Sequence, residues 1–208
     1  VMSNAYKRSS KFDKHNYEID PDNVYFWRMN EKRLEAEQIR DSLLFVSGKL
    51  DESHKNISDF QTDIRRPSKE LSRYIASTTA RSIYIPSLRD NKIEVLDIFD
   101  RPDNSLLNAE RSVTTVSTQA LFLMNNPKII ALAQEQAQIL LDRNKKMGKT
   151  MPKILYRNNV NEIFLKFLGR PPSETELGAS KDFIEADNNN LAHLIQILIC
   201  TGEFRNVK

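Results

Sequence analysis

The sequence predicts a mainly α-helical fold, an irregular multi-helix bundle with at most a short β segment near residues 81–86. Two observations favour this class. Apolar residues recur at spacings of three and four along several stretches, which is the period of a helix face that packs on a core. Proline or a polar capping residue precedes several of these stretches, and glycine follows some of them, as is typical of helix ends.

The first strong helix is expected over about residues 30–47, with Gly48 as its C-terminal stop. Charged side chains at Glu37, Arg40 and Asp41 lie together on one side of it, and Leu44 falls within the same stripe. Three interpretations of the stripe stay open. It is a solvated ladder of ion pairs, a semi-buried network that pairs with another segment, or part of a catalytic site. The apolar face of the helix comprises Ala36, Ile39, Leu43 and Val46.

The pattern is weaker between this helix and the middle of the chain. Residues 49–80 are polar and suggest a long loop with a short helix over 68–78. Residues 81–86 alternate polar and apolar side chains, which indicates a short strand that Pro86 ends or keeps at an edge. Residues 91–100 fit either a short helix or a buried extended piece, because their apolar side chains show no clear period.

Three carboxylates follow closely on one another at Asp97, Asp100 and Asp103. They do not have the spacing of a calcium-binding EF-hand loop, and no histidine lies nearby to complete a transition-metal site. The open interpretations are capping of turns and helix ends, salt bridges to Arg111 or Arg81, and a role in metal binding or catalysis.

The stretch 111–125 begins polar and β-branched and then turns apolar. We expect an extended segment that becomes a helix near Ser117 or Thr118, with either hydroxyl capping its first turn. Because residues 120–124 carry no charge, we expect protein to enclose that helix on most sides. Pro127 then opens the next helix.

The last third predicts a three-helix unit. One helix spans about residues 152–168, a second begins at a capping box formed by Ser173 and Glu176, and a third runs from Leu191. We therefore expect a helical body with long loops over residues 1–148 and a C-terminal three-helix unit over 149–208 packed on it, as one continuous domain fragment.

Composition excludes several kinds of site. A net charge of +3 is too small to argue for nucleic acid. The single cysteine, Cys200, excludes an internal disulfide, a cysteine-based zinc site and haem attachment through two cysteines. The three histidines lie far apart in sequence, and dinucleotide and phosphate-loop fingerprints are absent. We expect no cofactor, no metal and no membrane span in this chain. Its abrupt start suggests a fragment of a longer protein.

Several segments, in order and spacing, resemble a C-terminal domain of unknown function from exported planctomycete-type bacterial proteins, the "PSD" domain. These segments are residues 6–10, 19–23, 27–29, 33–44, 47–50, 81–86, 99–103, 111–115, 119–125 and 168–172. The resemblance implies that the domain's N-terminal part is missing. It also implies an extracytoplasmic location, periplasmic or at the cell surface, and a cytochrome-c-like domain upstream in the parent protein. It departs at 51–78, where the family tends to have a glycine-rich loop and this chain has no glycine.

Two functions follow as hypotheses. The first is a non-catalytic accessory or interaction module whose partners are other domains of the parent protein, among them the cytochrome-c-like one. The second is an extracytoplasmic carbohydrate-handling or hydrolytic domain, with polysaccharide as partner. Its polar site would consist of Glu37, Arg40, Asp41, Asp97, Asp100 and Arg111. The first predicts no deep polar pocket, and the second requires these side chains to lie together.

Overall fold

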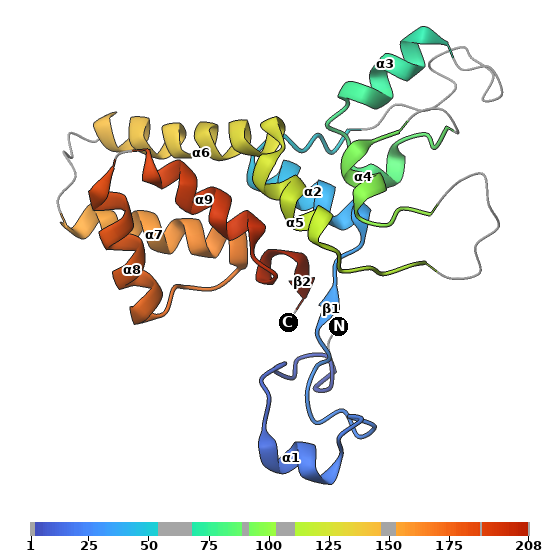
Figure 1. Cartoon of the computed structure of the whole chain (residues 1–208), viewed down its shortest axis with the longest axis vertical. Helices are drawn as coiled ribbons and strands as arrows, with labels where there is room; N and C mark the ends of the chain where they lie inside the picture. The colour runs from blue at the N-terminus through green and yellow to red at the C-terminus, as the bar shows by residue number, and fades with distance from the viewer. Residues whose placement is uncertain are drawn as a thin grey trace. The chain divides into compact units, whose positions relative to one another are not determined.

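The computed structural model of the chain confirms a mainly α-helical fold. It describes residues 3–53, 68–88, 92–102, 111–146, 153–187 and 189–207. Within those ranges lie nine α-helices and one two-stranded antiparallel sheet. The chain divides into two units (Figure 1). Unit 1 comprises Val1–Leu34 with Arg205–Lys208, and unit 2 comprises Glu35–Phe204. The predicted boundary at 148–149 falls among residues outside the described ranges and stays a prediction.

Unit 1 contains the helix α1 (Lys14–Ile19) and the sheet of β1 (Lys32–Arg33) and β2 (Asn206–Val207). Lys32 pairs with Val207 and Arg33 with Asn206, so the last described residues of the chain pair with residues 32–33. After α1 the chain turns around the buried carboxylate of Asp20. This carboxylate accepts hydrogen bonds from the backbone N–H groups of Val24 and Tyr25 at 2.9 and 2.8 Å.

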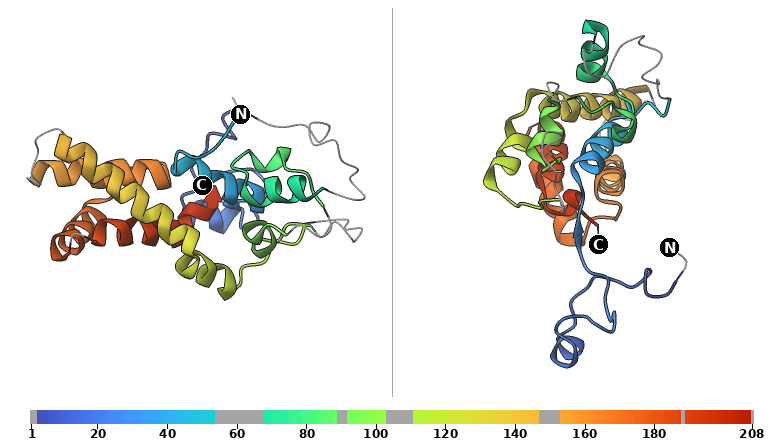
Figure 2. Two further views of the ribbon diagram at one scale, coloured as in Figure 1. Left: turned by 90° about the horizontal axis from the view of Figure 1, so that it is seen from above. Right: turned by 90° about the vertical axis from the view of Figure 1, so that its right-hand side faces the viewer.

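Unit 2 is built around the helix α9 (Asn190–Cys200), which contacts four other helices. These are α5 (Ser117–Asn125), α6 (Pro127–Lys146), α7 (Lys153–Leu168) and α8 (Glu174–Ala186). α6 and α9 lie side by side (Figures 1 and 2). One side of α9 is almost completely buried. The apolar residues on this side have the predicted helical spacing and are Leu191, Leu194, Ile195, Leu198 and Ile199.

The other part of unit 2 holds α2 (Ala36–Val46), α3 (Lys69–Ser77), the 3-10 helix η2 (Ser82–Tyr84) and α4 (Glu94–Ile98). α2 contacts η2 and α4. α3 packs through Leu71 and Ile75 onto Leu88. A further 3-10 helix, η3 (Glu203–Arg205), follows α9. The short helix predicted over 68–78 is confirmed, with Ser68 as its N-cap.

The strand predicted near 81–86 is wrong, because η2 occupies that position. In η2 the polar Ser82 is 6% exposed, whereas the apolar Ile83 is 79% exposed. Ser82 is buried because its polar groups bind the α2 side chains Arg40 and Asp41. A tertiary hydrogen bond therefore outweighs the local pattern.

Two predicted helix starts also change. α2 begins at Ala36 rather than near residue 30, because the preceding residues form β1. α5 begins at Ser117 as expected, but its N-cap is Val116, which has no capping side chain, so the predicted hydroxyl cap is wrong. Protein does not enclose α5 on most sides either, since Leu121 is 53% and Met124 52% exposed.

The predicted capping box of Ser173 and Glu176 is confirmed at the start of α8. Its Glu176 also accepts two hydrogen bonds from Arg170, at 2.9 and 2.7 Å. Arg170 donates two more to Glu203, at 2.7 and 2.8 Å. One guanidinium thus connects the start of α8 with the residue that begins η3 after α9.

The burial of α9 predicts that substitutions at nearby positions differ strongly in their effect on the free energy of unfolding. Ile195 is 0% exposed, whereas Ile197 is 51% exposed. We expect Ile195→Ala to lower the free energy of unfolding by about 2–5 kcal/mol, since a buried cavity replaces packed atoms. Ile197→Ala, its matched control, should change it by less than about 0.5 kcal/mol. Urea denaturation measures both, and equal losses would contradict the assigned burial.

The Arg170 network predicts a loss of stability in acid. Hydrogen bonding to Arg170 lowers the pKa of Glu176 from 4.5 to about 2. The contribution of this carboxylate is therefore complete above pH 4.5 and lost as the pH falls towards 2. Glu176→Gln should flatten the pH dependence of the melting temperature in that window. The side chain of Glu174 is 84% exposed, so Glu174→Gln serves as control and should leave the pH dependence of the melting temperature as in the wild type.

Candidate functional site

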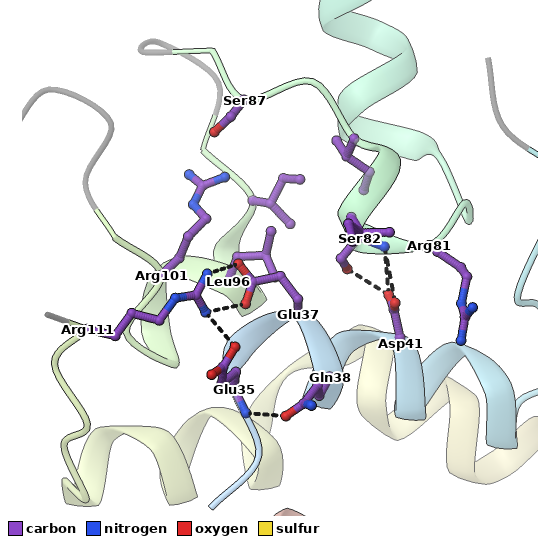
Figure 3. Close-up of a pocket in the computed structure, with 13 residues that line it drawn as sticks. Glu35, Glu37, Gln38, Asp41, Arg81, Ser82, Ser87, Leu96, Arg101 and Arg111 are labelled. Carbon is purple, nitrogen blue, oxygen red and sulfur yellow. Dashed lines mark hydrogen bonds and ion pairs between the residues drawn. The ribbon is translucent and has the colours of Figure 1, made fainter. Parts of the chain in front are cut away.

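A pocket of about 580 Å³ lies over the N-terminal part of α2 and faces η2 and α4. Figure 3 shows that Glu37 and Asp41 point from α2 towards Arg111 and Ser82, respectively. The pocket wall is both polar and apolar. Its lining residues are Glu35, Glu37, Gln38, Asp41, Arg81, Ser82, Ile83, Ile85, Ser87, Ile93, Leu96, Arg101 and Arg111.

A bidentate ion pair lies at one end of the pocket. Arg111 donates to both carboxylate oxygens of Glu37, at 2.8 and 2.9 Å, and to Glu35 at 3.0 Å. Planar guanidinium and carboxylate groups fit each other in this bidentate manner. The hydrogen bonds from Arg111 lower the pKa of Glu37 below its ordinary value. Glu37 is therefore held in its ionised form.

The middle of the pocket wall consists of Asp41 and the backbone that it binds. The N–H and hydroxyl groups of Ser82 donate to Asp41 at 2.9 and 2.7 Å. Asp41 is thus an acceptor that holds η2 against α2.

Arg40 lies beside Asp41 and forms an ion pair with it at 3.5 Å, and its other contacts are with residues 78–82. It donates to the carbonyl oxygens of Thr78 and Ala80 at 2.6 and 2.9 Å and to Ser82 Oγ at 3.0 Å. The residue is only 8% exposed, and this burial lowers the pKa of its guanidinium. Arg40 is absent from the lining of the pocket over α2 and belongs to the interior that holds residues 78–82.

The aspartates that follow α4 have local structural partners. Asp97 accepts a hydrogen bond from Arg101 at 2.8 Å, one helical turn away. Asp100 has a φ of +67°, which aspartate tolerates better than most residues. Its carboxylate accepts hydrogen bonds from the N–H and the hydroxyl of Thr114, at 2.8 and 2.7 Å. Asp97 thus forms an ion pair, with Arg101 rather than with the predicted Arg111 or Arg81, and Asp100 holds the segment before α5. Asp103 lies outside the described residues.

The structure therefore brings only half of the predicted site together. Glu37, Asp41 and Arg111 line the pocket, whereas Arg40, Asp97 and Asp100 do not. Of the three interpretations of the α2 stripe, the contacts match the semi-buried network that pairs with another segment. Within the described ranges, no group of three or more acidic, histidine or cysteine side chains is placed to hold a metal ion.

Sequence reasoning missed several pocket residues. Glu35 is the N-cap of α2, in a capping box with Gln38 whose three-residue spacing is visible in the sequence. Glutamate is an uncommon N-cap, so the signal was not recognised. Arg81 and Ser82 carried no local signal, because their places depend on contacts with residues about 40 positions earlier.

Comparisons with known proteins give one finding. The sequence pattern of one family, PSD1, described as "Protein of unknown function (DUF1553)", matches residues 1–184. Searches of curated proteins and of solved structures returned no match. Among the described residues, no helix is long and apolar enough to cross a membrane.

The burial of Arg40 predicts a structural role for it. Arg40→Gln removes a charged donor and leaves the buried carbonyl groups of Thr78 and Ala80 without their partner. We expect the free energy of unfolding to fall by roughly 3 kcal/mol. The exposed Arg73 on α3 supplies the matched control, and Arg73→Gln should cost less than about 0.5 kcal/mol. Chemical denaturation tests the pair, and a near-neutral Arg40→Gln would contradict the assigned role.

Proposed function

The chain belongs to the PSD1 family, and we propose that it is a non-catalytic accessory or interaction module of an exported, extracytoplasmic protein. Its proposed partners are other domains of the parent polypeptide, among them an upstream cytochrome-c-like domain. The proposal treats the pocket over α2 as a surface for recognition. It assigns the polar side chains there to positioning rather than to chemistry.

The observation that carries the proposal is the engagement of every carboxylate in the pocket. Glu35 and Glu37 bind Arg111, and Asp41 binds Ser82. General acid–base catalysis needs a group whose pKa lies near the working pH. The pKa of Glu37 lies below its ordinary value, and so further from a neutral working pH. Fixed ion pairs of this kind instead hold a binding surface in one shape.

A specific feature keeps polysaccharide handling as the second candidate. Two acidic side chains, Glu37 and Asp41, line one pocket together with Arg111. Glycoside hydrolysis uses a pair of carboxylates on either side of the bond that is cleaved. For this function, substrate would have to displace Arg111 from Glu37, which makes the candidate easy to separate from the first.

The two candidates predict different results in one set of measurements. For the interaction module, calorimetry should detect binding of the cytochrome-c-like domain of the same parent polypeptide to the chain. Neutral and sulfated oligosaccharides should leave the melting temperature unchanged. A ligand at 100 times its dissociation constant would add about 2.7 kcal/mol to the folded state, which a thermal-shift assay readily detects.

The alternative outcome is equally definite. A stabilising oligosaccharide, lost in both Glu37→Gln and Asp41→Asn but kept in the surface control Glu174→Gln, would replace the proposal by the carbohydrate-handling function. Release of reducing sugar that requires Glu37 would do the same. Absence of binding to the parental domain would contradict the interaction module.

A further inference from the structure

The pocket over α2 continues into a second pocket of about 380 Å³. The two share Gln38, Asp41 and Arg81 in their walls. Beyond these residues the second pocket follows α2 through Ser42 and Phe45. Positions 38, 41, 42 and 45 are three and four residues apart and so lie on one face of the helix. Together the pockets form a groove along this face, which we call the α2 groove.

Five of the ten residues that line the second pocket are apolar. Phe167, Phe204 and Val46 are each at most 6% exposed, so the body of unit 2 holds them in place. Phe45 is 68% exposed, and its ring stands at the side of the groove, where a ligand can cover it. Walls of this kind fit a bulky apolar side chain.

Two cations at the second pocket form no salt bridge within the part of the chain that the structure describes, although Glu162 on the same helix attracts Lys166 electrostatically. The exposed side chain of Arg81 makes no hydrogen bond or ion pair with the described residues. It lies beyond Asp41 as viewed from Arg111 (Figure 3). Lys166 donates at 2.6 Å to the neutral side chain of Gln136. Asp41, the acidic residue in this part of the wall, already accepts hydrogen bonds from Ser82.

We propose that the α2 groove binds an extended acidic peptide segment of the partner. A carboxylate of the peptide pairs with Arg81 and Lys166, and a neighbouring apolar side chain packs against Phe45, Phe167 and Phe204. The proposal rests on the interaction-module function and names the surface and the chemistry of that interaction. Charge complementarity at Arg81 and Lys166 sets the sign of the ligand.

The shape of the α2 groove favours a peptide over an anionic glycan. Sugars are commonly bound against an exposed flat ring with polar groups around it. Here Phe167 and Phe204 are buried walls, and only Phe45 has an open ring. A pocket with apolar side chains on part of its wall and cations on another part matches an apolar residue that follows an acidic one. Extended peptides offer such side chains at regular intervals.

The test uses fluorescence anisotropy of the 208-residue chain with a labelled octapeptide in which glutamate alternates with leucine. The expected result is binding that weakens as salt increases, because exposed charge pairs are screened. Arg81→Glu should reduce the affinity by at least about tenfold, and Phe45→Ala by a similar factor. Both side chains are exposed in the free chain, so the variants should keep the wild-type melting temperature.

Matched controls separate the α2 groove from general surface charge. Arg73→Gln and Ile197→Ala, at exposed positions outside the groove, should bind the acidic peptide as the wild type does. An octapeptide in which lysine alternates with leucine should not bind. Absence of binding of the acidic peptide at about 1 mM would overturn the proposal. Equal binding by wild type and Arg81→Glu would overturn it too.

Two further outcomes distinguish this proposal from the function on which it rests. If the parental cytochrome-c-like domain binds wild type and Arg81→Glu equally well, the interaction module stands and the α2 groove is not its surface. If a sulfated oligosaccharide binds in an Arg81-dependent manner and the acidic peptide does not, the occupant is a glycan and the peptide proposal is wrong.

Discussion

The part of unit 2 that carries the pocket depends on two neighbouring side chains of α2, which bind a segment about 40 residues further along the chain. Arg40 donates to the carbonyl oxygens of Thr78 and Ala80, and Asp41 accepts from the N–H and hydroxyl groups of Ser82. Apart from the Ser82 hydroxyl, these are backbone groups of residues 78–82, which run from the end of α3 to the start of η2. Since an unpaired buried polar group costs about 1–3 kcal/mol, the two charged side chains replace the missing secondary structure.

The same principle extends across the pocket. Glu37 and Arg111 join α2 to the extended segment before α5. Asp100 accepts a hydrogen bond from the backbone N–H of Thr114 in that segment. Every carboxylate in these contacts meets a donor that the fold keeps in position. The segment before α5 therefore owes its place to electrostatic contacts, whereas α9 is placed mainly by apolar burial. The polar stripe of α2 works as a structural connector.

Sequence patterns identified the elements that depend on near neighbours. The apolar repeat of α9, the capping box of α8 and the proline that opens α6 all act within a few residues and were predicted correctly. The conformation around Ser82 was not predicted correctly, because it depends on a hydrogen bond to Asp41, which lies 41 residues earlier in the sequence. Glu37, Asp41 and Arg111 were recognised as candidates from their charge. The pairing of Glu37 with Arg111 and of Asp41 with Ser82 was not predicted, because it depends on tertiary contacts with α2.

The ion pairs in the pocket also suit it to the proposed binding role. A groove whose walls are already fixed loses little conformational freedom when it binds, and preorganisation of this kind improves affinity. In the α2 groove the carboxylates are occupied, while Arg81 stays available and Phe45 remains exposed. In the proposed interaction, the charges that are paired within the chain hold the shape of the groove, and the unpaired charge of Arg81 selects the ligand. Arg40 and Arg81 illustrate the two roles on either side of Asp41.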